Sequence, residues 1–109
     1  MEKRLELSRL MDFYAPLLTD RQREFLEMYV LDDFSLQEIA EQEGISRQGV
    51  RDALMRGEKT LAEIEDKIGL ADKIFEFEGQ LEAFVEKIRE FGNADLAEEL
   101  RDILKNWRD

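Results

Sequence analysis

Residues 35–54 have the sequence SLQEIAEQEGISRQGVRDAL, which predicts two short helices joined by a tight turn. Ser35 and Glu38 have the three-residue spacing of a capping box that starts the first helix. Ala40 supplies the small side chain required where two helices cross closely, and Gly44 tolerates the positive φ of the turn. Apolar residues then hold the two helices together: Ile39, Ile45, Val50 and Leu54. The stretch predicts a helix-turn-helix; the alternative is an ordinary helical hairpin whose glycine merely ends a helix.

The second helix of this motif is predicted to begin after Ser46 and to carry a local excess of positive charge. Between Gly44 and Gly57 three arginines stand against one aspartate, although the whole chain has a net charge of −11. In helix-turn-helix proteins this helix enters the major groove, where arginine binds guanine and glutamine binds adenine through paired hydrogen bonds. We therefore predict nucleic-acid contacts along the Arg47–Lys59 helix. The residues predicted to contact base edges are Ser46, Arg47, Gln48, Arg51 and Asp52, and those predicted to contact phosphates are Arg56 and Lys59. For any one of these side chains alone, a solvated surface position is an equally good interpretation.

The rest of the chain also shows helical periodicity, and its glycines and single proline mark segment ends. Outward from the motif we predict helices over about residues 2–14, 19–33 and 71–91, and a last helix capped by Asn93. The helix from Ser46 continues with an apolar side that includes Leu61, Ile64 and Ile68. The predicted fold is all-α with about six helices. It is expected to be a single domain, residues 1–109, with a helix-turn-helix core over 1–70 and a C-terminal helical pair over 71–109.

The composition excludes several kinds of chemistry. The sequence contains no cysteine and no histidine, which removes thiol catalysis, thiolate ligands, the commonest general base and the commonest metal ligand. Acidic runs such as 63–66 fit the solvated faces of amphipathic helices. We therefore expect no catalytic residues, no metal site and no cofactor, and predict that the protein is not an enzyme. No apolar run approaches the about 20 residues that span a bilayer, so we expect a cytoplasmic protein.

Aromatic residues are concentrated in the last third of the chain. They are Phe75, Phe77, Phe84, Phe91 and Trp107. One interpretation is an intramolecular core against the helix that starts at Ser46. The other is the interface of a homodimer, which would also place two recognition helices in one particle.

The motif and the residues before it resemble a known family. Residues 19–52, TDRQREFLEMYVLDDFSLQEIAEQEGISRQGVRD, are similar to the YlxM family of small bacterial proteins, which itself resembles the promoter-reading fourth region of sigma factors. The similarity is close over residues 1–70 and reduces to helical character over 71–109. Gly49 and Arg51 stand where many relatives have an alanine and an aromatic residue. The resemblance implies a helix-turn-helix protein that is associated with the signal recognition particle (SRP) or regulates genes, since the family's genes neighbour those of the targeting GTPases.

Three functions are consistent with these observations. The first is a non-catalytic nucleic-acid-binding or adaptor protein of the SRP pathway, with DNA or SRP RNA as its ligand; the pathway rests on the resemblance. The second is a DNA-binding transcriptional regulator that resembles a detached sigma-factor reading head. The third is a protein-binding module whose acidic surface docks a basic partner such as an SRP GTPase, and the net charge favours this one.

Overall fold

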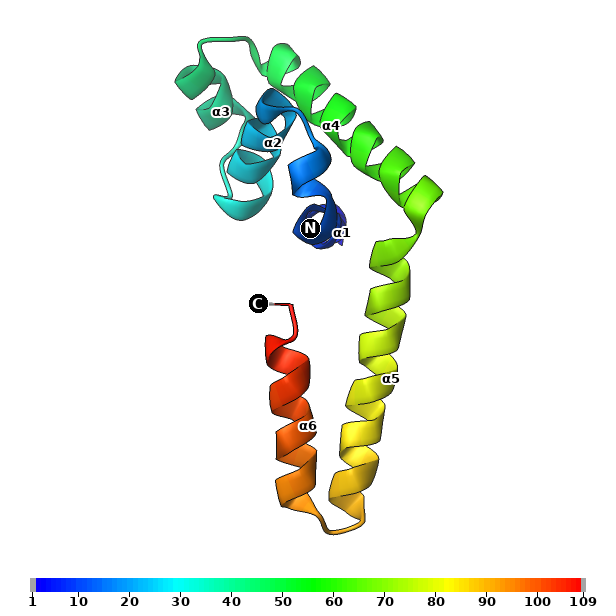
Figure 1. Ribbon diagram of the computed structural model, residues 1–109. Helices are drawn as coiled ribbons and strands as arrows, with labels where there is room; N and C mark the ends of the chain where they lie inside the picture. The colour runs from blue at the N-terminus through cyan, green and yellow to red at the C-terminus, as the bar shows by residue number, and fades with distance from the viewer. Residues whose placement is uncertain (1, 109) are drawn as a thin grey trace. The chain divides into compact units, whose positions relative to one another are not determined.

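The computed structural model describes residues 2–108, with side chains from Lys3 onward, and the prediction of an all-α fold is confirmed (Figure 1). The described chain contains six α-helices, one 3₁₀ turn (η1) and one π-helical segment (η2). In order they are α1 Glu2–Tyr14, η1 Ala15–Leu17, α2 Asp20–Leu26, η2 Glu27–Leu31, α3 Leu36–Glu43, α4 Arg47–Ile68, α5 Leu70–Glu90 and α6 Ala94–Asn106. The chain divides into two compact units, Met1–Ala71 and Asp72–Asp109, hereafter unit 1 and unit 2.

The helix ends in unit 1 follow the local sequence signals. The hydroxyl of Thr19 accepts from the backbone N–H of Gln22 at 3.1 Å, and the hydroxyl of Ser35 accepts from that of Glu38 at 3.0 Å. In both cases the residue three positions on returns a side-chain bond, which completes a capping box. Gly44 ends α3 with a φ of 69°, the left-handed conformation that favours glycine. The predicted start, turn and end of the motif are therefore confirmed.

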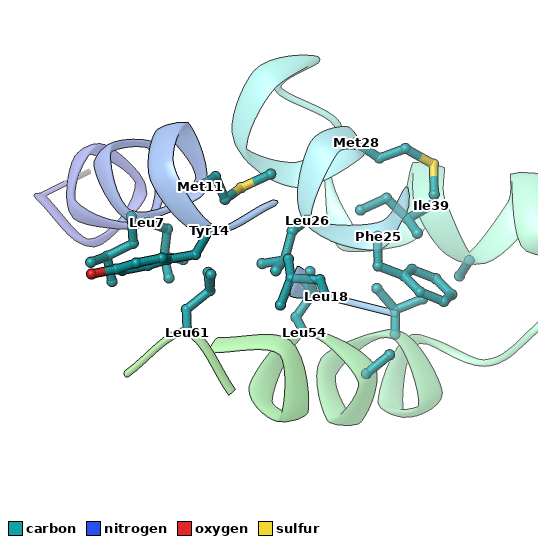
Figure 2. Close-up of a cluster of buried hydrophobic side chains, with 14 of the residues drawn as sticks. Leu7, Met11, Tyr14, Leu18, Phe25, Leu26, Met28, Ile39, Leu54 and Leu61 are labelled. Atoms are coloured by element: carbon teal, nitrogen blue, oxygen red, sulfur yellow. The ribbon is translucent and has the colours of Figure 1, made fainter. Parts of the chain in front are cut away.

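The core of unit 1 lies between α4 and the helices α1, α2 and α3 that pack against it (Figure 2). The largest fully buried side chains of the unit are Tyr14, Phe25, Leu26, Ile39, Val50 and Leu61. Full burial of one such side chain contributes roughly 1.5–3 kcal/mol, so this cluster is the main stabilising element of the unit.

The prediction for the end of α4 needs one correction. Ile68 follows Leu61 by seven residues and lies on the same side of the helix, but its side chain is 53% exposed. The last fully buried residue of α4 is Leu61 and Ile64 is only partly buried, so the cover on this side of the helix decreases toward its end. A sequence period marks the face of a helix but not how far along that face a neighbour extends.

Helices α2 and α4 cross closely at Gly57 of α4. A Cβ atom at Gly57 would lie 2.9 Å from Cδ1 and 3.3 Å from Cγ of Leu26 in α2, closer than normal contact. Glycine is therefore required for the two helices to cross at this distance, although it costs about 1 kcal/mol of helix propensity relative to alanine.

The hydroxyl of Tyr14 connects α1 to the start of α5. It donates to the carboxylate of Glu65 and accepts from the backbone N–H groups of Leu70 and Ala71 at 3.2 and 3.3 Å. These N–H groups belong to the first turn of α5, where a helix has no backbone acceptors of its own. Burial, together with the bond to Glu65, raises the pKa of Tyr14 above its ordinary value.

Candidate nucleic-acid interface

The first half of α4 is held firmly by the turn that precedes it. The N–H of Ile45 donates to the carbonyl of Ala40 at 3.1 Å, and the hydroxyl of Ser46 caps α4 by accepting from the N–H of Gly49 at 3.0 Å. Ile39, Ala40, Val50 and Leu54 are buried and Ile45 is half-buried, so both helices of the motif are anchored in the core of unit 1. The direction of the exposed side chains of α4 is thereby fixed.

The outermost side of α4 carries Gln48, Asp52 and Lys59. All three are exposed and lie opposite the buried residues of the helix. The amide of Gln48 donates to the carboxylate of Asp52 at 3.0 Å, so these two side chains form one polar unit. Met55 lies on the same side and is also exposed. Because the amide nitrogen of Gln48 is engaged by Asp52, paired recognition of adenine would require this bond to open.

The arginines lie on the two flanks of this central strip. Arg47 and Arg51 are one turn apart and share one flank, whereas Arg56 lies about 140° further round the helix than Arg51, because successive residues are about 100° apart. All three are exposed. A helix with its side chains is about 10–12 Å across and the major groove is about 12 Å wide, so side chains on the strip and on both flanks fit within one groove.

All seven predicted contact residues are thus exposed on α4 or at its cap. The structure brings them together as a strip with two flanks, not as a single basic stripe: Ser46 and Arg47 at the start, Gln48 with Asp52 and Lys59 along the centre, Arg51 on one flank and Arg56 on the other.

Contacts between Arg4 of α1 and the segment before α3 also position the motif. They were not predicted from the sequence. Arg4 of α1 forms an ion pair with Asp33, donates to the carbonyl of Phe34 at 3.4 Å, and lies 4.1 Å from the ring centre of Tyr29. Asp33 has a φ of 59°, which is uncommon outside glycine but tolerated by aspartate. Because these residues are 25 to 30 positions apart, no local sequence pattern indicates the contact.

The first helix of the motif, α3, presents negative charge. Glu38 and Glu41 are both exposed. The backbone and side-chain hydrogen bonds from Ser35 lower the pKa of Glu38, so this carboxylate stays ionised well below neutral pH. A phosphate beside α3 would meet these charges, so contacts through α4 are more favourable than contacts through α3.

The described part of the chain offers neither a metal-binding group nor a membrane span. No three of its carboxylates converge as ligands for a metal ion, and none of its helices is both long and apolar enough to cross a bilayer.

A short helix joined through a left-handed glycine to a longer helix that is exposed along its polar side defines a helix-turn-helix protein. The chain belongs to the UPF0122 family, described as "Putative helix-turn-helix protein, YlxM / p13 like", whose pattern matches residues 1–106. This is not an enzyme family.

Curated relatives in several bacteria carry the same family name. A UPF0122 protein of Caldanaerobacter subterraneus subsp. tengcongensis is 51% identical over 84 residues, which are 77% of this chain and 72% of the relative. One of Acetivibrio thermocellus is 40% identical over 105 residues, or 96% and 90% of the two chains. One of Geobacillus kaustophilus is 41% identical over 109 residues, or 94% and 96%.

Proposed function

We propose that the protein binds nucleic acid through the first half of α4 and acts as a non-catalytic regulator or adaptor. The observation that carries this proposal is the arrangement of α4, in which a polar strip of Gln48 and Asp52 lies between arginines on both flanks. The membership of a helix-turn-helix family supports it. The helix would enter the major groove with Ser46, Arg47, Gln48, Arg51 and Asp52 near base edges and with Arg56 and Lys59 near phosphates.

The negative charge of the chain requires nucleic-acid binding through α4 to depend on a few well-placed contacts. The chain has a net charge of −11 and α3 exposes acids beside the recognition helix, so long-range repulsion opposes the approach of a phosphate backbone. Each phosphate contact adds about −0.9 to the slope of log K against log salt concentration for duplex DNA, and we expect a shallow slope.

The direct test replaces Arg47 and Arg51 together by alanine. We expect this variant to lose at least about tenfold in affinity for the preferred nucleic acid, because each good bidentate pair contributes about 1–3 kcal/mol. The matched control is Lys67→Ala with Lys105→Ala, two exposed cations outside the proposed interface. Both variants should keep the parent's helical circular-dichroism signal and melting temperature. Equal affinities for the two double variants would contradict the proposal.

We also propose which nucleic acid is bound and in which pathway. We propose SRP RNA as the ligand in the SRP pathway, on the strength of the family resemblance, and a promoter-like DNA target as the alternative that the sigma-factor resemblance favours. Fluorescence anisotropy with SRP RNA and with genomic duplex fragments distinguishes the two.

A second candidate function is docking to a basic protein such as an SRP GTPase. The observation that favours it is the exposed carboxylates Glu63 and Asp66 on α4, in a chain of net charge −11. In that case Glu63→Lys would weaken capture of the GTPase, whereas the arginine pair would be neutral for capture.

A further inference from the structure

The two helices of unit 2 form an antiparallel hairpin that buries little of its own apolar surface (Figure 1). Among the residues described from Asp72 onward, only Val85 and Ala97 are buried hydrophobics. Units of fewer than about 40 residues usually need a disulfide, a metal or a partner chain for stability. Since the sequence has no cysteine, a partner surface is the physically available solution.

Both helices of the hairpin carry the seven-residue repeat of a coiled coil. Leu70, Phe77 and Phe84 of α5 and Phe91, which directly follows the helix, are spaced at intervals of seven. Ile74, Leu81 and Ile88 of α5 have the same spacing. The first series is exposed and the second is half-buried. On α6, Leu96 and Ile103 have the same spacing and are exposed, and Leu100 has it with Trp107, the residue that caps the end of the helix. In coiled coils such paired series form the seam that contacts another helix.

The exposed series of the two helices lie on one side of the hairpin. A hollow of about 260 Å³ is lined by apolar side chains from both helices, namely Phe77, Leu81, Leu100, Ile103, Leu104 and Trp107. The charged residues that pair between the helices lie outside the lining of this hollow: Arg101 with Glu86 at 3.0 Å, Arg89 with Glu98 at 2.9 Å, and Arg108 with Glu78, which also accepts from the indole N–H of Trp107 at 3.0 Å. We call Phe77, Phe84, Phe91, Leu96, Ile103 and Trp107 the apolar face.

The size of the apolar face matches a stable protein interface. Phe91 is 91% exposed and the other three aromatic side chains of the face about half exposed. At about 200 Å² for each aromatic side chain, they leave on the order of 500 Å² uncovered, before Leu96 and Ile103 are added. A standard interface buries about 800 Å² on each partner.

Charges at the edges of the apolar face are opposite on the two helices. By helix periodicity, Lys87 borders the phenylalanine series on the outer edge of α5, and Glu99 borders the Leu96 and Ile103 series on the outer edge of α6. The contacts of Arg89 with Glu98 and of Glu86 with Arg101 place Lys87 and Glu99 at the same height along the hairpin.

We propose that the apolar face pairs with the same face of a second copy, with α5 of each copy stacked on α6 of the other in a four-helix bundle. Rotation about a two-fold axis parallel to the helices leaves the position of each residue along that axis unchanged. Lys87 of each copy therefore faces Glu99 of the other copy, once at each edge of the interface. An axis perpendicular to the helices would instead stack α5 on α5, with the lysine-bearing edges on the same side of the bundle. Edge charges of this kind set the orientation of paired helices.

Sedimentation equilibrium of the full chain tests the interface. We expect the parent to dimerise, and Phe84→Ser to raise the dissociation constant at least about tenfold, as for a central aromatic anchor. Phe75→Ser is the matched control, because Phe75 is similarly exposed on α5 but lies away from the apolar face. The control should dimerise as the parent does. A monomeric parent, or equal effects of the two substitutions, would overturn the proposal.

Charge exchange tests the arrangement of the helices. Lys87→Glu alone and Glu99→Lys alone should each weaken the dimer, and the double variant should recover the parent's dissociation constant. A double variant no better than the weaker single variant overturns the stacking of α5 on α6. The apolar face lies outside α4, so these experiments succeed or fail independently of nucleic-acid binding.

Discussion

At the scale of single residues, two side chains of unit 1 make polar contacts with residues that are distant in the sequence. Tyr14 reaches the start of α5 and the carboxylate of Glu65, and Arg4 reaches the segment before α3. The Tyr14 side chain is only 2% exposed, so its hydroxyl has no ready replacement by water. The N–H of Ala71 also donates to the carboxylate of Glu65 at 3.1 Å, so loss of the hydroxyl falls mainly on the N–H of Leu70 and on Glu65. A buried polar group that loses its partner costs about 1–3 kcal/mol, more than the bond itself contributes.

Tyr14→Phe is therefore expected to lower the free energy of unfolding by about 1–3 kcal/mol at neutral pH. The raised pKa of Tyr14 also sets the pH dependence. The native state holds the phenol proton more tightly than the unfolded state, so this contribution is complete below the unfolded pKa and is lost as pH rises through the folded one.

Urea melts of the parent and of Tyr14→Phe at increasing pH measure this effect. The two unfolding free energies should converge as pH rises above the ordinary tyrosine pKa of 10.0. A constant difference across that range would show that the hydroxyl proton does not contribute.

At the scale of secondary-structure elements, the crossing of α2 and α4 fixes the position of the second helix of the motif relative to the rest of unit 1. Leu26 is fully buried at this crossing, so it has little room to move away from an added methyl group. Alanine in place of Gly57 gains about 1 kcal/mol of helix propensity, but overpacking costs about 1–3 kcal/mol.

Gly57→Ala should therefore be destabilising by up to about 2 kcal/mol in denaturant melts. Gly79→Ala is the matched control, since Gly79 is also helical but has no neighbour within 4 Å of an added Cβ, and it should be neutral or stabilising. In a Leu26→Ala background, Gly57→Ala should become stabilising. If Gly57→Ala stabilises the parent chain as Gly79→Ala does, the tight crossing is not the reason for the glycine.

The same elements show which parts of the fold a sequence can predict. Ser35, Glu38 and Gly44 were predicted correctly because capping and left-handed turns depend on residues within a few positions of each other. The Gly57 crossing and the Tyr14 bonds were not predicted, because they join residues 31 to 57 positions apart. Their partners are chosen by the packing of whole helices.

At the scale of the whole molecule, the two units have different physical characters. Unit 1 has a core of fully buried aromatic and aliphatic side chains around the motif, whereas unit 2 presents a row of exposed phenylalanines. The sequence pattern marks both sets as apolar and helical. Whether such residues are buried within one chain or between chains is decided by how many helices are available to cover them.

The candidate interface was predictable in its members but not in its arrangement. The exposure of Arg47, Gln48 and Arg51 follows from the period of α4, whereas the bond between Gln48 and Asp52 depends on side-chain conformation. This arrangement leads us to expect base contacts from the central strip and from the flank of Arg47 and Arg51, and phosphate contacts from Arg56 and Lys59.

The most direct test of the central claim is a map of backbone amide NMR shifts as nucleic acid is added to the full chain. We expect the largest changes to fall within residues 46–59, with SRP RNA or with duplex DNA, and residues 72–108 to change little. Changes confined to residues 72–108, or no changes at ligand concentrations that saturate other helix-turn-helix proteins, would contradict the central claim.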